Sequence, residues 1–317
     1  MPASTINYAT TAKLKLLIQR TKGHTVHVCC LFLINTTNNR HQNIILVIHL
    51  IHRSTLNLFH MQNSFLSVLT IPVNDPVAFT FFIGYMAMAA SAVFFLFERS
   101  TVTDKWKTSL LISGLITGIA AVHYYYMRDF YMTSKTTPIA LRYIDWTLTV
   151  PLMVVEFYLL VRAAGAKVSL LWKLVLAAVV MLVAGYIGEA FTDKSMGHSV
   201  LWGTISTVGY LYIVYSAWVG EVAQLAAKSE SVTVQKGVRA LAWFILVGWA
   251  IYPIGYMAMP GGLLGPDGAG LLRPSDLDLI YNVGDAINKI GFGLVVYGIA
   301  RSESDAKVAP AGVVSAV

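Results

Sequence analysis

The chain has 317 residues, of which 56% are hydrophobic and only 12% are charged, with a mean hydropathy of +0.64. Soluble domains carry roughly 25% charged residues, so this composition excludes an ordinary soluble protein and indicates a membrane protein. The formal net charge of +7 does not indicate nucleic-acid binding, because six positive charges lie in the first 74 residues and the remainder is nearly neutral.

Residues 1–74 differ in composition from the rest of the chain. They contain no Asp or Glu, and their apolar runs, such as 26–34 and 44–51, are too short to span a bilayer. The two cysteines are adjacent here, which predicts no disulfide framework, and no spacing typical of a metal site is present. A basic, acid-free stretch is typical of a targeting segment. Alternatively, it is a tail translated from an upstream start, with Met61 as one possible true start. We expect a poorly ordered leader that is removed or artefactual.

Seven apolar stretches follow, each long enough to cross about 30 Å of hydrocarbon. They lie at approximately 77–97, 106–127, 138–161, 170–189, 199–223, 234–257 and 277–300. Because the connections between them are short, the sequence predicts an all-α bundle of seven transmembrane helices over 75–303. The protein would be a multi-pass protein of the cell membrane, with a cytoplasmic tail at 304–317.

The basic residues of the connections predict the orientation of the bundle. The first, third and fifth connections together with the C-terminal tail carry eleven Lys and Arg residues, whereas the second, fourth and sixth connections carry four. Cytoplasmic loops are enriched in Lys and Arg. The C-terminus is therefore expected in the cytoplasm and the N-terminus of the first helix outside.

The third stretch contains a stripe of polar residues in the run RYIDWTLTVPLMVVE. At 100° per residue, Arg142, Asp145, Thr149 and Glu156 fall close to one line along a helix. Charged side chains at such depths normally face the bundle interior and mark ion or proton paths. Polar contacts that merely hold neighbouring helices together are the alternative interpretation.

The seventh stretch places Lys289 near the middle of the membrane. A lysine there costs about 2.5–3.5 kcal/mol on insertion, and Asp285 lies four residues earlier on the same helical face. The two residues could form a structural ion pair. A desolvated lysine amine could instead attack a carbonyl and form a Schiff base.

The balance of charges in the third and seventh stretches distinguishes a candidate proton donor from a candidate proton acceptor. Lys289 and Arg142 balance Asp145 and Asp285, so the set is neutral without Glu156. Because no cation is in local reach of Glu156, desolvation favours its protonated form. A neutral acid on the inner side and an ionised acid beside a lysine are the expected features of a proton donor and a proton acceptor.

Four motifs in this order resemble the microbial rhodopsins, and among them the light-driven proton pumps of the proteorhodopsin and xanthorhodopsin group. They are RYIDWTLTVPLMVVEFYLL, GYIGE, GWAIYPIGY and YNVGDAINK. The resemblance covers roughly residues 75–305 and does not extend to the leader. It implies that the protein is a transporter rather than an enzyme. This transporter would move protons outward across the lipid bilayer and assemble as a homo-oligomer, either a pentamer or a trimer.

The resemblance also implies roles for particular residues. Lys289 would carry all-trans retinal as a protonated Schiff base, and Asp145 would be its counterion and proton acceptor. Asp285 would be the second carboxylate, with Arg142 stabilising both from the outer side. Glu156 would be the proton donor.

The resemblance places aromatic and apolar residues around retinal. Any one of them alone is more often ordinary bundle core. The pocket residues it implies are Trp146, Thr149, Met153, Trp249, Tyr252 and Tyr281. The apolar Met153 is similar to the residue of green-absorbing members, and Pro253 is expected to kink the sixth helix.

Two further residues have both an ordinary and a functional interpretation. His123, near the outer end of the second helix, could simply pack in the core, but the resemblance implies that it contacts Asp145. Gly203 could serve close helix packing. In xanthorhodopsin-like proteins a glycine at this place opens a window beside retinal, so a hydroxylated carotenoid is expected as a second chromophore.

Other functions are weighed against the pump. A sensory photoreceptor that signals to a membrane partner would share Lys289, but such relatives usually lack the carboxylate at Glu156. A receptor or transporter without retinal leaves Lys289, Asp145 and Asp285 unexplained. A light-gated channel remains an alternative function. No outer pair of glutamates like the proton-release group of archaeal pumps is evident. Glu189 is the nearest candidate, and in this group it is expected to be structural.

Overall fold

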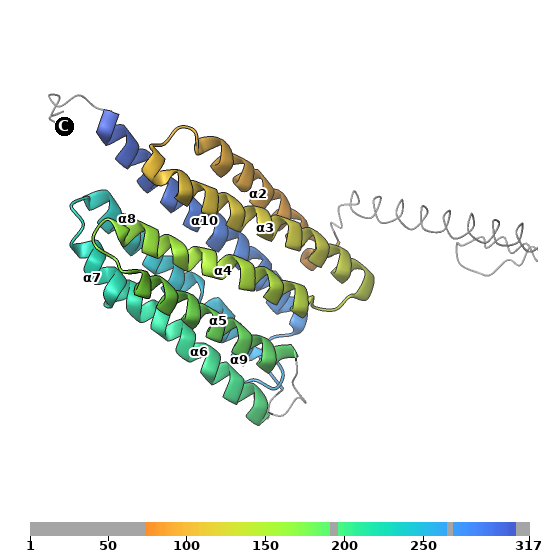
Figure 1. Ribbon diagram of the computed structural model, residues 1–317. Coiled ribbons are helices and arrows are strands. Elements are labelled where there is room, and N and C mark those ends of the chain that lie inside the picture. Colours follow the sequence, from red (N-terminus) through yellow and green to blue (C-terminus); the bar gives the residue numbers. More distant parts are fainter. Residues whose placement is uncertain (1–73, 191–195, 265–268, 309–317) are drawn as a thin grey trace, which may run out of the picture. The chain divides into compact units, whose positions relative to one another are not determined.

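The computed structural model describes residues 74–190, 196–264 and 269–308, and the predictions for the leader fall outside these ranges. Within them, all regular structure is helical (Figure 1). Seven helical segments are long and apolar enough to cross a membrane, as predicted. They are Pro76–Glu98, Asp104–Ser134, Ile139–Arg162, Val168–Ala190, Gly197–Ala227, Val232–Ala258 and Pro274–Lys307. Which end of the bundle is cytoplasmic stays a prediction from the loop charges.

The first four spans are single helices, and the last three differ in continuity. The single helices are α2 (Pro76–Glu98), α3 (Asp104–Ser134), α4 (Ile139–Arg162) and α5 (Val168–Ala190). The fifth span comprises α6 (Met196–Trp218) and the short α7 (Glu221–Ala227). The sixth comprises α8 (Val232–Trp243), the π-helix η1 (Phe244–Gly248) and α9 (Ile251–Ala258). The seventh span is α10 (Pro274–Val308), which continues beyond the predicted end of the bundle at 303.

The seven spans form a closed bundle in which the last span packs against the first. Helices α2 to α6 contact one another in sequence order, and α10 contacts α2, α3 and α8 (Figure 1). The seventh span therefore lies beside the first, and its polar face meets α3 and α4 in the interior. Large apolar side chains such as Phe97 and Trp172, which are 75% and 66% exposed, remain on the outside, where lipid would cover them.

A local ion pair joins the ends of α2 and α3. Asp75 caps α2, since its carboxylate accepts a hydrogen bond from the backbone N–H of Ala78 at 3.1 Å. The same carboxylate pairs at 2.8 Å with the Nζ of Lys135, which ends α3 in the left-handed conformation with φ 55°. One residue thus starts the first span and fixes the end of the second.

The discontinuity predicted at Pro253 is present, but it extends toward the N-terminal side of the proline. Pro253 has no N–H and its ring crowds the carbonyl four residues earlier, so the regular hydrogen-bond ladder cannot continue through Trp249. The carbonyl of Trp249 instead accepts from the backbone N–H of Tyr252 at 3.2 Å. One turn earlier, the backbone N–H of Trp249 donates to the carbonyl of Phe244 at 3.0 Å, a π-type bond.

Side chains from two other spans satisfy the carbonyl groups that this break exposes. The Tyr210 hydroxyl of α6 donates to the carbonyls of Ile245 (3.1 Å) and Leu246 (2.9 Å). The Asn288 amide of α10 donates to the carbonyl of Gly248 at 2.9 Å. Buried carbonyls without partners are costly in a membrane interior, so Tyr210 and Asn288 stabilise the broken helix. Asn288 directly precedes Lys289, which places the break beside the predicted site.

Candidate functional site

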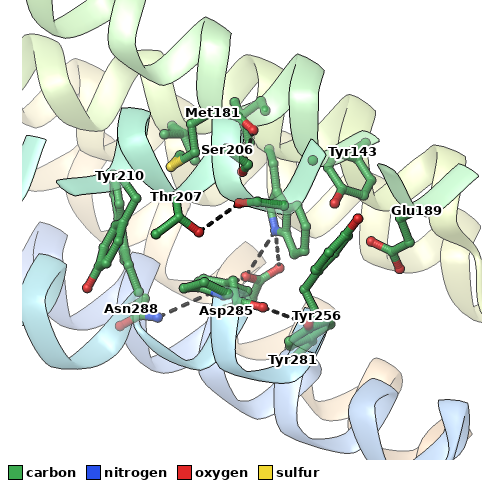
Figure 2. Close-up of a pocket in the computed structure, with 18 of the residues that line it drawn as sticks. Tyr143, Met181, Glu189, Ser206, Thr207, Tyr210, Tyr256, Tyr281, Asp285 and Asn288 are labelled. Carbon is green, nitrogen blue, oxygen red and sulfur yellow. Dashed lines mark hydrogen bonds between the residues drawn. The ribbon is translucent and has the colours of Figure 1, made fainter. Parts of the chain in front are cut away.

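A cavity lies inside the bundle between α4, α5, α6, α9 and α10 (Figure 2). Lys289 is part of its lining. Of the predicted pocket residues, Trp146, Met153, Trp249, Tyr252 and Tyr281 line it. Thr149 is buried but is not part of the lining, and its hydroxyl donates to the carbonyl of Asp145 at 2.9 Å. The walls are mostly aromatic and apolar, as expected for a site that binds a flat apolar molecule.

Several lining residues were not expected from the sequence. Tyr143 and Glu189 lie together on one side of the cavity (Figure 2), where the Tyr143 hydroxyl donates to the Glu189 carboxylate. Tyr256 lies against Gly203, where an added Cβ would come within 2.7 Å of the tyrosine ring. Gly203 therefore allows the Tyr256 ring to pack directly on the backbone of α6.

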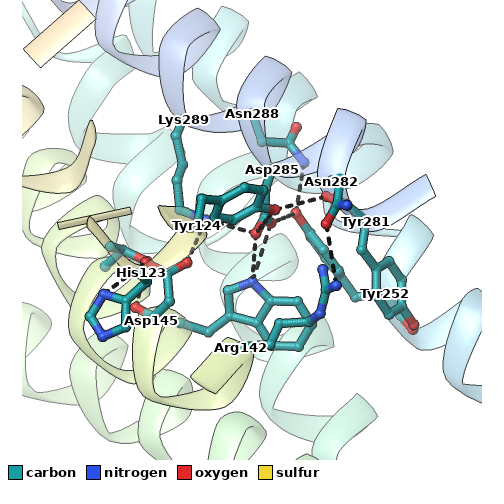
Figure 3. A network of polar contacts seen from close by, with 12 residues as sticks. His123, Tyr124, Arg142, Asp145, Tyr252, Tyr281, Asn282, Asp285, Asn288 and Lys289 are labelled. Atoms are coloured by element: carbon teal, nitrogen blue, oxygen red, sulfur yellow. Dashed lines mark hydrogen bonds and ion pairs between the residues drawn. The ribbon is translucent and has the colours of Figure 1, made fainter. Parts of the chain in front are cut away.

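Lys289 is 3% exposed and its Nζ lies between two carboxylates (Figure 3). It is 3.1 Å from an oxygen of Asp145 on α4 and 3.1 Å from an oxygen of Asp285 on α10. Both aspartates are essentially inaccessible to solvent. The lysine and aspartate that the sequence pairs on one helix thus form a three-residue cluster with Asp145, deep in the bundle.

The two carboxylates have different surroundings. Asp285 accepts hydrogen bonds from the Tyr124 hydroxyl at 2.7 Å, the Trp146 indole N–H at 3.1 Å and the Tyr252 hydroxyl. Apart from the ion pair with Lys289, neither oxygen of Asp145 has a hydrogen-bond donor in the part of the chain that the structure describes. Three donors stabilise the charge of Asp285, whereas Asp145 has no such donors and is the better placed of the two to take up a proton.

His123 lies at the edge of this cluster on α3 (Figure 3). Its Nδ1 is 2.9 Å from the carbonyl of Ile119 and 3.9 Å from an oxygen of Asp145. The ring is thus tied to its own helix through the hydrogen bond to Ile119, and it lies beside Asp145 as the resemblance implies.

Arg142, which the resemblance assigns to the stabilisation of Asp145 and Asp285, forms its direct ion pair with Asp278, while its charge also acts on Asp285. Its Nη2 donates to Asp278 at 2.8 Å and to the side-chain oxygen of Asn282 at 3.2 Å, and both Arg142 and Asp278 are 1% exposed. The sequence-based charge count did not include Asp278, which lies about two turns from Asp285 along α10. Asp278 thus joins Asp145 and Asp285 as a third buried carboxylate next to the buried cations Lys289 and Arg142.

The polar stripe of α4 faces the interior as predicted, since none of its members is more than 1% exposed. At its far end, Glu156 is completely buried, and no ion pair among the described residues involves it. The Ser109 hydroxyl of α3 lies next to it, but neither carboxylate oxygen makes a hydrogen bond of good geometry within the described ranges. Glu156 is thus an isolated acid in apolar surroundings, three helical turns from Asp145.

A family model described as bacteriorhodopsin-like protein matches residues 75–302. The chain belongs to this family. The resemblance noted in the sequence is therefore confirmed. The protein is a multi-pass membrane protein of a family of light-driven pumps, which are transporters rather than enzymes.

Individual relatives agree with this assignment. The chain is 44% identical over 235 residues to the blue-light absorbing proteorhodopsin of Gamma-proteobacterium Hot 75m4, which covers 74% of this chain and 90% of that protein. It is 42% identical over 237 residues to the green-light absorbing proteorhodopsin of Gamma-proteobacterium EBAC31A08, with the same coverage. The crystal structure of xanthorhodopsin, described as a light-driven ion pump with dual chromophore, superposes with a TM-score of 0.62 at 28% identity. It covers 73% of this chain and 95% of that one.

Proposed function

We propose that this chain is a light-driven pump that moves protons outward across the membrane and carries retinal on Lys289. The observation that supports the proposal most strongly is the buried Lys289 amine held 3.1 Å from Asp145 and from Asp285, next to an aromatic cavity. Membership in the bacteriorhodopsin-like family adds the light-driven chemistry. A structural ion pair alone would not require the cavity.

The cavity suits retinal in shape and chemistry. Aromatic side chains of Trp146, Trp249, Tyr252 and Tyr281 would hold the flat polyene, and the Lys289 amine supplies the point of attachment. When bound, retinal absorbs visible light and changes the position and proton affinity of the Lys289 nitrogen. The remaining steps are carried by side chains of the protein.

Asp145 is the proposed acceptor of the proton that the Lys289 nitrogen gives up. Its oxygens lack the three donors that stabilise the charge of Asp285, so protonation disrupts fewer interactions at Asp145. Asp285, held by Tyr124, Trp146 and Tyr252 from three other helices, stays ionised and keeps the site oriented.

Glu156 is the proposed donor that restores the proton. It lies on the same face of α4 as Asp145, about 16 Å further along the helix axis, and is enclosed by apolar residues without a cation. A neutral carboxylic acid is stable in such surroundings. With the orientation indicated by the loop charges, Glu156 lies toward the cytoplasm and Asp145 toward the outside, so the proton moves outward.

Replacement of Glu156 by Gln tests the donor role. We expect recovery of the proton on the Lys289 nitrogen to slow by about 10²-fold or more, the usual contribution of a positioned acid, while the pigment still forms. The measurement is flash-induced absorption recovery at neutral pH. Glu221→Gln, which changes a half-exposed carboxylate paired with Lys173, should recover at the unmodified rate. An unchanged rate in Glu156→Gln would exclude Glu156 as the donor.

A carotenoid site is the second part of the proposal. Gly203 lines both the predicted retinal cavity and a second groove beside α6 and α9. The residues that line both the cavity and the groove are Gly203, Thr207, Tyr256 and Met257. These shared residues, among them Gly203 and the Tyr256 ring, thus lie between the cavity and the groove. We infer that a hydroxylated carotenoid lies in the groove and passes light energy to retinal.

Replacement of Gly203 by Trp should abolish that energy transfer. Gly203 lines the groove, and an added Cβ already comes within 2.7 Å of the Tyr256 ring, so an indole here would displace that ring or occupy the groove. The measurement is the excitation spectrum of retinal emission after a hydroxylated carotenoid has been added to the pigment. The carotenoid bands should be present in the unmodified protein and absent from Gly203→Trp. Gly197→Trp, at a position with no neighbouring heavy atom within 4 Å of an added Cβ, should retain them.

A further inference from the structure

The outer part of the polar network contains an ion pair whose role the proposed pump does not yet explain. Asp278, near the start of α10, accepts a hydrogen bond from Arg142 at 2.8 Å and another from the Thr137 hydroxyl at 2.9 Å. Both charged side chains are 1% exposed. Burial of an ion pair is costly, so the pair is expected to have a function beyond stability.

The guanidinium of Arg142 uses only one of its three nitrogens for hydrogen bonds to the described residues. Only its Nη2 is used, for Asp278 and for Asn282, which in turn donates to the hydroxyl of Thr80 on α2. Its Nε and Nη1 have no hydrogen-bond acceptor among the described residues. The guanidinium is thus held by Asp278 through one nitrogen, and two donors are free to bind another carboxylate.

The other carboxylates within the network are Asp145 and Asp285. A cation close to a carboxylate stabilises its charged form, and this interaction weakens as the cation moves away. With Arg142 bound to Asp278, the Lys289 nitrogen is the cation in direct contact with the two aspartates. The position of Arg142 therefore affects how easily Asp145 accepts a proton.

We propose that Asp278 is a positioning residue, which holds the Arg142 guanidinium away from Asp145 and thereby favours protonation of Asp145. The inference rests on the proposed function, because Asp145 is taken as the proton acceptor. Asp278 acts through Arg142 and does not itself touch Lys289. It is also a contact that neither the α4 stripe nor the resemblance to the rhodopsins had indicated.

The other ionisable groups nearby do not replace Arg142 in this role. The groups that interact electrostatically with Asp278 or Arg142 are Tyr124 and Tyr131 of α3, Glu189 of α5, and Tyr281 and Asp285 of α10. None of them is a cation. The groups that face Asp145 are Lys289, Asp285 and His123. Arg142 is therefore the charge through which a change at Asp278 would reach Asp145.

The test is a colour titration of the purified full-length pigment, formed with all-trans retinal. Protonation of Asp145 removes a charge beside the chromophore and shifts its absorption maximum, so the midpoint of the shift reports the acceptor. In Asp278→Asn the guanidinium is released and moves toward the aspartates. The midpoint should then fall by about one pH unit, the size expected when a charge moves a few ångströms closer at an effective dielectric constant of about 20. Asp278→Ser, a second neutral replacement, should give the same shift.

Two controls separate positioning from other effects. In an Arg142→Gln background, Asp278→Asn should cause little further shift, since the residue through which it acts is gone. Asp276→Asn, which removes an acidic charge on the same helix that pairs with the exposed Arg273, should leave the midpoint unchanged. If the titration midpoint of both neutral Asp278 variants equals that of the unmodified protein, or if the full shift persists without Arg142, the positioning role of Asp278 is overturned. The proposed pump function is unaffected by either result. If the unmodified chain forms no pigment, the proposed function itself fails.

Discussion

Replacement of Asp145 by Asn will abolish net proton transport while a coloured pigment still forms. Asparagine preserves the size of the side chain but cannot take up a proton from the Lys289 nitrogen, which lies 3.1 Å from the carboxylate. Asp285 cannot substitute for it, because Tyr124, Trp146 and Tyr252 already donate to that carboxylate. The loss should exceed about 10²-fold, in line with the removal of a positioned proton acceptor.

The measurement is light-driven pH change in proteoliposomes that contain equal amounts of pigment, judged by absorbance. Asp305→Asn serves as the control, since Asp305 is an exposed carboxylate that pairs with Arg301 at 3.1 Å on the same helix. Its transport should equal that of the unmodified protein. Transport that persists in Asp145→Asn would show that another group accepts the proton.

Replacement of Lys289 by Arg will eliminate the pigment while the protein stays folded. A guanidinium keeps the positive charge between Asp145 and Asp285 but does not form the imine bond with a carbonyl that an amine forms. Lys289→Ala should also be colourless. It should in addition lose about 3–5 kcal/mol of stability, because the removal of one partner leaves buried charge without compensation.

The measurement combines visible absorbance after addition of all-trans retinal with thermal unfolding of the same samples. The pair of variants separates attachment from folding, since the arginine variant removes only the reactive amine. A visible, retinal-dependent absorption band in both variants would mean that retinal attaches elsewhere or that the cavity holds it without a covalent bond.

The features that the sequence predicts well depend on local spacing. The seven spans follow from runs of apolar residues, and the burial of the α4 stripe follows from the periodicity that relates Arg142, Asp145 and Glu156. The same argument was available for α10, where Asp278, Asn282, Asp285 and Lys289 fall close to one line. The partner of Asp278, Arg142 on α4, is not evident from this spacing, because it depends on how α4 and α10 pack.

The features that were not predictable depend on contacts between distant segments. Composition and helical spacing do not show which donors surround Asp145 and Asp285. In the structure, donors from α3, α4 and α9 meet Asp285. Pro253 indicates a break in the sixth span. The extent of that break follows from Tyr210 and Asn288, which lie on two other helices and satisfy its exposed carbonyls. Partners of this kind are fixed by packing, and helical periodicity does not reveal them.

Outward proton pumping is tested most directly by the light-induced pH change of an unbuffered suspension of cells that express the chain with added all-trans retinal. We expect acidification of the medium in the light, which a protonophore abolishes and which does not occur without retinal. A coloured pigment that produces no pH change would contradict the pump and favour a sensory photoreceptor. Alkalinisation of the medium would contradict the outward direction.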